Sequence, residues 1–192
     1  EDLDFEPHSF DLVVGAAILH HLFHPEKVIE RLASLLKPSG IAIFFEPFEN
    51  GMSLMGLIYQ AILRHQSFFR KLQPAQKAYF KHSVRTWQKM KSKDKDDPFF
   101  KGIDDKWLFT RHYFYELAEK FDFAKCIIFR LDKSETPFVS LAKTHFTGNN
   151  VGSLPAWVYE IIRQYEDWFS ADLKHDFLTE GGIIFQKSFG ID

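Results

Sequence analysis

The stretch "FDLVVGAAILHHLFHPEKVIERLASLLKPSGIAIFFEP", residues 10–47, decides the fold of this 192-residue chain. It begins with an apolar run, 10–17, without polar alternation, which is typical of a strand buried on both faces of a parallel sheet. Pro25 predicts the first position of a helix, because the N–H that proline lacks would have no partner there. The turn "KPSG", 37–40, and a second apolar run, 41–47, follow. We therefore expect a right-handed strand–helix–strand unit.

Further helices and strands are expected along the rest of the chain. Thr110 predicts the N-cap of a helix over 110–123, and a strand follows at 125–131. An amphipathic helix is expected over 154–169, and two glycines lead into a last strand over 181–188. This alternation predicts an α/β fold with helices on both faces of the sheet.

Residues 50–107 differ in character and are predicted to form a basic helical insertion, or lid. Between Asn50 and Lys93 the sequence has nine lysines and arginines and no acidic residue, so an insertion beside an active crevice would attract an anionic substrate. A basic amphipathic helix can also lie on a membrane surface, and peripheral membrane contact is a further expectation. Aromatic residues at helical spacing are expected to form the core of the insertion, with an apolar wall of a binding site as the alternative. They are Phe68, Phe69, Tyr79, Phe80 and Trp87.

Composition narrows the class of protein. The chain is 45% hydrophobic and 26% charged, with a net charge of −2, which suits one globular domain. No apolar run approaches the roughly 18 residues of a membrane span, and the acidic N-terminus does not resemble a signal peptide. The single cysteine, Cys126, excludes an internal disulfide and favours the cytoplasm. Nucleic acid is not expected as a partner, because the net charge is negative and no recognition motif is present.

Three histidines, His20, His21 and His24, lie within five positions and raise the question of a metal site. His20 and His24 would share a face only if one helix covered both, and Pro25 places His24 at or before the helix start. No HExxH arrangement and no second Cys/His cluster follows. A metal site is therefore not expected, and histidines that cap the helix or lie in the loop remain an alternative.

The order of these pieces resembles the second half of a class I S-adenosylmethionine-dependent methyltransferase. The resemblance rests on "DLDF" (2–5), "FDLVV" (10–14), "LHH" (19–21), "LLKPSG" (35–40) and "IAIFFEP" (41–47), with Ser39 where the family often has glycine. More loosely, "YELAEKFDF" resembles the helix before the sixth strand, "CIIFRL" that strand, and "GGIIFQK" the antiparallel seventh. The resemblance implies a partial Rossmann-like sheet of family strands four to seven, and makes 1–192 the C-terminal portion of a methyltransferase domain.

The resemblance also implies a cofactor, S-adenosylmethionine, and an activity, methyl transfer to a small-molecule acceptor. The basic insertion suggests that this acceptor is anionic or lipid-like. In α/β sheets a ligand binds beyond the carboxyl ends of the strands, where the small residues Gly15, Ala16 and Ala17 let a flat group approach the backbone. Substrate-side candidates are Glu46 and Tyr59, and a salt-bridged carboxylate at a strand end is an equal alternative for Glu46. The expected cofactor-binding residues are Asp2, Leu3, Ala16, Ala17 and His21. The acceptor, the catalytic base and the oligomeric state are not identified.

The glycine-rich turn that follows the first strand of the family is not in this chain. We therefore expect that the chain is a fragment, that the first three strands precede Glu1, and that residues 10–14 have an unpaired edge. Such a chain would hold the cofactor poorly by itself. Two alternatives to an enzyme of this kind are a catalytically inactive methyltransferase-like module for protein or membrane-surface interaction, and a nicotinamide-binding oxidoreductase, which shares the general fold.

Overall fold

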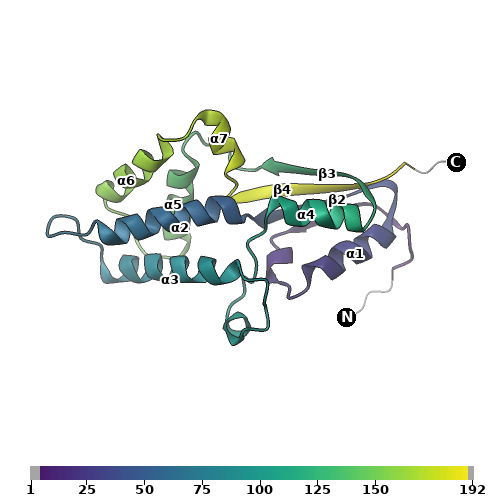
Figure 1. The fold of residues 1–192 in the computed structure, drawn as a ribbon, viewed down its shortest axis with the longest axis horizontal. Coiled ribbons are helices and arrows are strands. Elements are labelled where there is room, and N and C mark those ends of the chain that lie inside the picture. The colour runs from purple at the N-terminus through teal and green to yellow at the C-terminus, as the bar shows by residue number, and fades with distance from the viewer. Residues whose placement is uncertain (1–4, 190–192) are drawn as a thin grey trace. The chain divides into compact units, whose positions relative to one another are not determined.

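The computed structural model describes residues 5–189 and divides the chain into two compact units (Figure 1). The sheet unit comprises Glu1–Phe48, Lys93–Leu131 and Glu180–Asp192. The helical unit comprises Glu49–Ser92 and Asp132–Thr179. Each unit is built from segments that are distant in sequence, so the chain passes from one to the other several times.

Within residues 5–189, four strands form one sheet, in the order β1-β2-β4-β3. Strands β1 and β2 are parallel, whereas β4 is antiparallel to both of its neighbours, with Arg130 of β3 paired to Gly181 of β4. The α/β class and the antiparallel last strand are therefore confirmed. The strands are β1 (Phe10–Ala16), β2 (Leu36–Pro47), β3 (Phe123–Arg130) and β4 (Glu180–Lys187).

The helices of the sheet unit begin where the sequence predicts. Helix α1 (Pro25–Leu35) joins the two parallel strands and has Pro25 at its start. Helix α4 (Arg111–Lys120) follows Thr110, whose Oγ1 accepts a hydrogen bond from the Tyr113 backbone N–H at 3.1 Å. This bond satisfies one of the free donors of the first turn, and it confirms the predicted N-cap. Two short 3-10 helices complete the unit, η1 (Leu19–His21) and η2 (Pro98–Gly102).

The predicted turn at 37–40 lies inside β2, which begins at Leu36. The pairing with β1 shifts register in this region. Ser39 has a φ of 63°, in the left-handed region that few non-glycine residues adopt. A Cβ on Gly40 would lie 2.8 Å from the carbonyl oxygen of Lys37, so only glycine fits there. The turn is therefore an irregularity of the strand rather than a separate connection.

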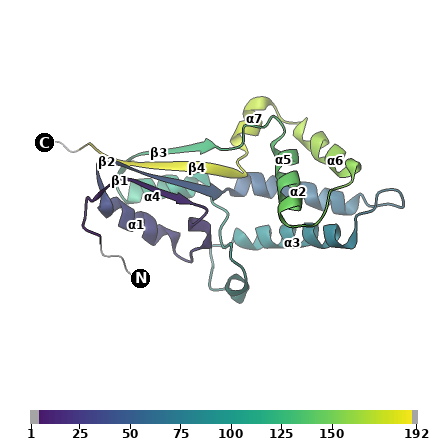
Figure 2. The ribbon, with the colours of Figure 1, turned by 180° about the vertical axis from the view of Figure 1, so that it is seen from behind.

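One face of the sheet is packed and the other is open. Phe185 of β4 is fully buried, and its ring centroid lies 6.1 Å from that of Phe114 in α4. Helix α4 lies in front of the sheet in Figure 1 and behind it in Figure 2. On the open face, Leu12 and Val14 of the edge strand β1 are 54% and 57% exposed. Within residues 5–189 the predicted unpaired edge is present, and the expected helices on both faces are not.

The helical unit has an aromatic core. Its helices α2 and α3 run side by side in both views (Figures 1 and 2). The ring of Tyr59 lies 4.5 Å from Phe80 and 5.4 Å from Trp87, centroid to centroid. No helix in the described part of the chain is long and apolar enough to cross a membrane. The helices are α2 (Glu49–Arg64), α3 (Pro74–Met90), α5 (Pro137–Gly148), α6 (Ala156–Glu166) and α7 (Ala171–Asp176).

The structure differs from the expected insertion over 50–107 in two respects. Residues 93–107 belong to the sheet unit, and the second segment, Asp132–Thr179, belongs to the helical unit. Helix α2 ends at Arg64, so Phe68 and Phe69 are not on its buried face. Their side chains are 77% and 90% exposed, and the prediction that they belong to the core is wrong.

Candidate functional site

The carboxylate of Glu46, at the end of β2, organises the turn that follows β1. Its Oε1 accepts hydrogen bonds from the backbone N–H groups of Ile18 and Leu19, at 3.2 and 2.8 Å. Its Oε2 accepts one from the backbone N–H of His20 at 3.2 Å and lies 2.6 Å from His20 Nδ1. The Glu46 side chain is 0% exposed, and a buried carboxylate is tolerated only where donors surround it. These contacts join the carboxyl ends of the two parallel strands.

The alternation of side chains along β2 decides where Glu46 points. Ala42 and Phe44 are 0% and 2% exposed, and Glu46 shares their face of the strand. Ala17, with a φ of 52°, turns the chain after β1, and the next three backbone N–H groups converge on the carboxylate. Glu46 is therefore a positioning residue that holds the "LHH" turn. Its side chain is fully buried, so the structure does not present Glu46 to a substrate that approaches from solvent.

His20 lies between two carboxylates. Its Nδ1 faces Glu46, and its Nε2 lies 3.4 Å from Asp105 Oδ1. Burial by itself would lower the pKa of His20, but the hydrogen bonds to Asp105 and Glu46 outweigh it and raise that pKa to about 9. The hydrogen bond from His20 lowers the pKa of Asp105 in turn. At neutral pH the turn therefore contains a buried imidazolium ion.

A distant segment completes the turn. The backbone N–H of Lys106 donates to the His20 carbonyl oxygen at 2.7 Å, and Trp107 Nε1 donates to the Leu22 carbonyl oxygen at 2.8 Å. Asp105 Oδ1 lies 3.3 Å from His21 Nδ1. Sequence reasoning missed Asp105, because it is far along the chain from the histidines and no motif marks it. The "LHH" turn is thus held from β2 on one side and from residues 105–107 on the other.

The same groups are the candidates for binding a cation. Within residues 5–189, the potential ligand atoms of His20, His21 and Asp105 lie within 4.8 Å of one another. The spacing of the histidines alone did not indicate this cluster, since it depends on Asp105. Both ring nitrogens of His20 already face carboxylates, so a cation would have to replace the proton on Nε2. The arrangement as it stands is an ion-pair network.

Three of the expected cofactor-binding residues lie together at the carboxyl end of β1. Ala16 and Ala17 are exposed and offer a backbone surface with no side chain beyond Cβ. The His21 side chain is 42% exposed and borders the same surface through the turn. The other two, Asp2 and Leu3, lie outside the described residues.

Two other residues that the sequence associated with ligands have packing roles. A Cβ on Gly15 would lie 2.7 Å from the ring of Phe44, so the small size of Gly15 accommodates that ring. Tyr59 is 0% exposed and packs in the core of the helical unit, so the structure does not present it to a substrate. Burial raises the pKa of Tyr59 well above its usual range, and its hydroxyl has no hydrogen-bond partner among the described residues.

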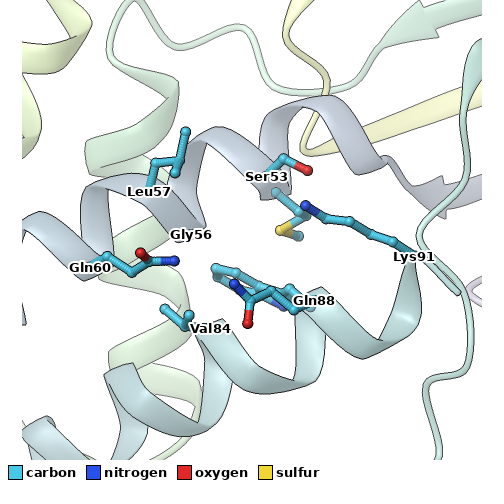
Figure 3. A pocket seen from close by; sticks show the side chains of 9 residues that line it. Ser53, Gly56, Leu57, Gln60, Val84, Gln88 and Lys91 are labelled. Atoms are coloured by element: carbon cyan, nitrogen blue, oxygen red, sulfur yellow. The ribbon is translucent and has the colours of Figure 1, made fainter.

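A small, open pocket of about 130 Å³ lies in the helical unit, lined by α2 and α3 (Figure 3). Ser53 and Gln60 on α2, Gln88 on α3 and Lys91 at the end of α3 supply its polar groups. The other lining residues are Met52, Gly56, Leu57, Val84 and Trp87. Two amides and one ammonium group around an apolar floor suit a small molecule that has both a polar or anionic part and an apolar part.

Residues 1–44 match the family of proteins described as "Methyltransferase domain". The match covers less than a quarter of the 192 residues. It contains β1, the "LHH" turn, α1 and most of β2, so the methyltransferase match covers the parallel strand pair. The match confirms the resemblance that the motifs of residues 2–47 indicate.

Curated relatives match about a third of the chain. The chain is 37% identical over 62 residues to a ubiquinone biosynthesis O-methyltransferase of Neisseria meningitidis, which is 32% of this chain and 26% of that enzyme. It is 36% identical over 58 residues to the hybrid PKS-NRPS synthetase xenE of Xenoacremonium sinensis, which is 30% of this chain and 2% of that protein. The chain therefore spans about a quarter, or less, of the curated relatives that it matches.

Solved structures of methyltransferases are also similar to the chain. A SAM-dependent methyltransferase from Archaeoglobus fulgidus has a TM-score of 0.46 at 14% identity, covering 95% of this chain and 62% of that one. The Haemonchus contortus phosphoethanolamine N-methyltransferase 2, in complex with S-adenosyl-L-methionine, has a TM-score of 0.45 at 14% identity, covering 96% and 35%.

Proposed function

We propose that this chain is part of an S-adenosylmethionine-dependent methyltransferase that acts on a small molecule. The observation that carries the proposal is the methyltransferase match over residues 1–44, which contains the turn clamped by Glu46 at the carboxyl ends of β1 and β2. Ligands of open α/β sheets bind beyond these strand ends. The cofactor would supply an electrophilic methyl group on a sulfonium, and the contribution of the protein would come mostly from positioning.

The exposed residues of the turn have distinct parts in this proposal. Ala16 and Ala17 would lie against a flat part of the cofactor, because they allow close approach to the backbone. His21 Nδ1 faces Asp105, so its Nε2 is the ring nitrogen that would accept a proton when the acceptor is a hydroxyl or an amine. Glu46 and His20 would hold this surface without touching the reacting atoms.

The acceptor in this proposal is anionic or lipid-like. Residues 50–93 contain nine basic and no acidic residues, and such a segment raises the local concentration of anions. The pocket of the helical unit adds Lys91 and two amides to an apolar floor. These features favour an acceptor with a negative charge and an apolar part over a cationic or wholly polar one.

Calorimetric titration of S-adenosylmethionine and S-adenosylhomocysteine into the full-length protein tests the proposal. We expect binding, and we expect Ala16→Leu to weaken it at least tenfold by covering the backbone surface. The matched control is Ala124→Leu at an exposed position of β3, which should leave affinity unchanged. His21→Ala should lower kcat more than cofactor affinity. Absence of binding would contradict the proposal and favour the second hypothesis, a catalytically inactive methyltransferase-like interaction module.

A further inference from the structure

Two phenylalanines stand at the tip of the connection between α2 and α3. Reciprocal backbone hydrogen bonds of 3.2 Å between Ser67 and Arg70 close a tight turn, and Phe68 and Phe69 are its two central residues. Their side chains are 77% and 90% exposed, and their rings meet edge to face with centroids 5.2 Å apart. The turn therefore presents adjacent aromatic rings to the surroundings, where large apolar groups indicate an interaction site.

The base of the turn is ordered by hydrogen bonds of its own. His65 Nδ1 donates to the Ala61 carbonyl oxygen at 2.8 Å, and Gln66 Nε2 donates to the Leu63 carbonyl oxygen at 3.0 Å. The Leu63 carbonyl is one that the end of a helix leaves without an intrahelical partner, and the Ala61 carbonyl also accepts from the His65 backbone N–H at 3.0 Å. The phenylalanines are thus held by a defined helix end and a closed turn, and not by a frayed last turn of α2.

Basic groups surround the aromatic tip. Arg64, Arg70 and Lys71 are exposed, and Lys71 Nζ lies 4.7 Å from the centre of the Phe68 ring. Lys77 and Lys81 are exposed one turn apart on α3, so they lie on one ridge of that helix. Residues 50–93 hold no acidic side chain although the chain as a whole has a net charge of −2. Positive charge therefore flanks the exposed rings and continues along α3.

We propose that the Phe68–Phe69 turn docks the helical unit onto the surface of an anionic phospholipid bilayer. Aromatic rings flanked by lysine and arginine are the combination that enters the boundary between headgroups and acyl chains, with the cations at the level of the lipid phosphates. A small soluble anion would be recognised by the basic groups without need of two exposed rings. A protein partner would have to be uniformly acidic over a wide area, whereas an anionic membrane has that charge by nature.

Membrane contact of this kind would be peripheral, because it is made by the side chains of one turn and the cations beside it. It goes beyond the proposed methyl transfer and depends on residues outside the cofactor surface. It therefore holds or fails independently of cofactor binding.

Co-sedimentation with vesicles tests the proposal. The full-length protein should bind phosphatidylglycerol-rich vesicles, bind pure phosphatidylcholine vesicles much more weakly, and lose binding as salt screens the charges. Phe68→Ser with Phe69→Ser should lower the vesicle partition coefficient more than tenfold, because each ring loses its burial in the membrane boundary. The matched control is Trp168→Ser: Trp168 is 86% exposed in the same unit but follows the acidic Glu166 and Asp167, and its loss should change nothing.

The basic ridge is tested with a second pair of variants. Lys77→Gln and Lys81→Gln should each lower partition about fivefold, whereas Lys125→Gln on β3 should not. In Phe69→Trp, lipids brominated near the headgroup should quench the added fluorescence. All variants change exposed side chains and should keep the parental free energy of unfolding.

Several results would overturn the proposal. No binding to phosphatidylglycerol vesicles at low salt would do so, and so would equal binding to phosphatidylcholine. Parental binding by the double serine variant would show that the tip is not the contact. Concentration-dependent self-association that disappears in that variant, without vesicle binding, would assign the turn to a second copy of the chain.

Discussion

Glu46→Gln keeps the shape of the buried side chain at the end of β2 and removes its charge. The amide oxygen can still accept hydrogen bonds from the N–H groups of Ile18 and Leu19, which face Oε1. The amide nitrogen takes the place of Oε2, so its hydrogens oppose the backbone N–H of His20. His20 also loses one of the two carboxylates that hold its ring in the charged form.

The cost follows from these contacts. A buried donor without a partner costs about 1–3 kcal/mol, and a lost hydrogen bond to a charged group costs about 1.5–3 kcal/mol. Removing one partner of a buried ion pair typically costs about 3–5 kcal/mol, which is similar to the sum of these two costs. We therefore expect Glu46→Gln to lower the free energy of unfolding by about 3 kcal/mol or more. It should also lower the pKa of His20 from about 9 towards its ordinary value.

Urea unfolding near neutral pH, followed by tryptophan fluorescence, measures the first effect, and an NMR titration of the His20 ring measures the second. The control is Glu26→Gln, which breaks the 3.2 Å contact of Glu26 with the exposed His24 side chain. A pair of that kind contributes at most about 1 kcal/mol. A decrease of about 1 kcal/mol or less in the free energy of unfolding of Glu46→Gln would refute the assignment of Glu46 as the residue that holds the turn. An unchanged pKa of His20 would also refute it.

Changes at three other positions test further features. The pKa of His20 is about 9 in the folded protein against an ordinary 6.5. His20 therefore contributes at most about 3 kcal/mol to the free energy of unfolding, in full below pH 6.5, and this contribution is lost as pH rises through 9. Equilibrium unfolding of the parent protein should show this loss of stability between pH 6.5 and 9, and unfolding of His20→Gln should not show it. Gly51→Ala should cost at least about 2 kcal/mol in denaturant unfolding, because the new Cβ would collide with the Leu178 carbonyl oxygen; Gly102→Ala, where a Cβ meets nothing, should cost far less. Tyr59→Phe removes a buried hydroxyl that has no partner among the described residues, so thermal unfolding should show equal or higher stability, and a loss above about 1 kcal/mol would contradict this.

The elements of the sheet unit were predictable because their signals are local. Pro25 and Thr110 mark helix starts through their own backbone chemistry, and both positions are confirmed. The end of α2 was not predictable in the same way. No glycine or proline follows Arg64 before Pro74, and side chains of His65 and Gln66 close the helix where a glycine would be expected. The helix predicted from the periodicity therefore extended past Arg64 and wrongly included the two exposed phenylalanines.

The candidate site was predictable only in part. Glu46 shares a strand face with Phe44, but residues 41–45 are apolar on both faces of the strand, so the sequence did not show which face is buried. The approach of Asp105 to His20 and His21 could not be predicted either, because it depends on how a distant loop folds back. The grouping of Asp132–Thr179 with the first helical segment is a long-range arrangement of the same kind.

The pairing of the strands has a consequence for how this protein can vary. The chain leaves β2 at Pro47 and returns beside it, where the N–H of Phe109 donates to the Pro47 carbonyl oxygen at 3.0 Å. Its second departure also begins and ends at paired positions, Arg130 and Gly181. Insertions are tolerated best where the two ends of a segment are already neighbours. The segment Asp132–Thr179 can therefore be lengthened, exchanged or shortened with little effect on strand pairing. The first departure is constrained further, because it also contains Asp105 and Trp107, which hold the "LHH" turn.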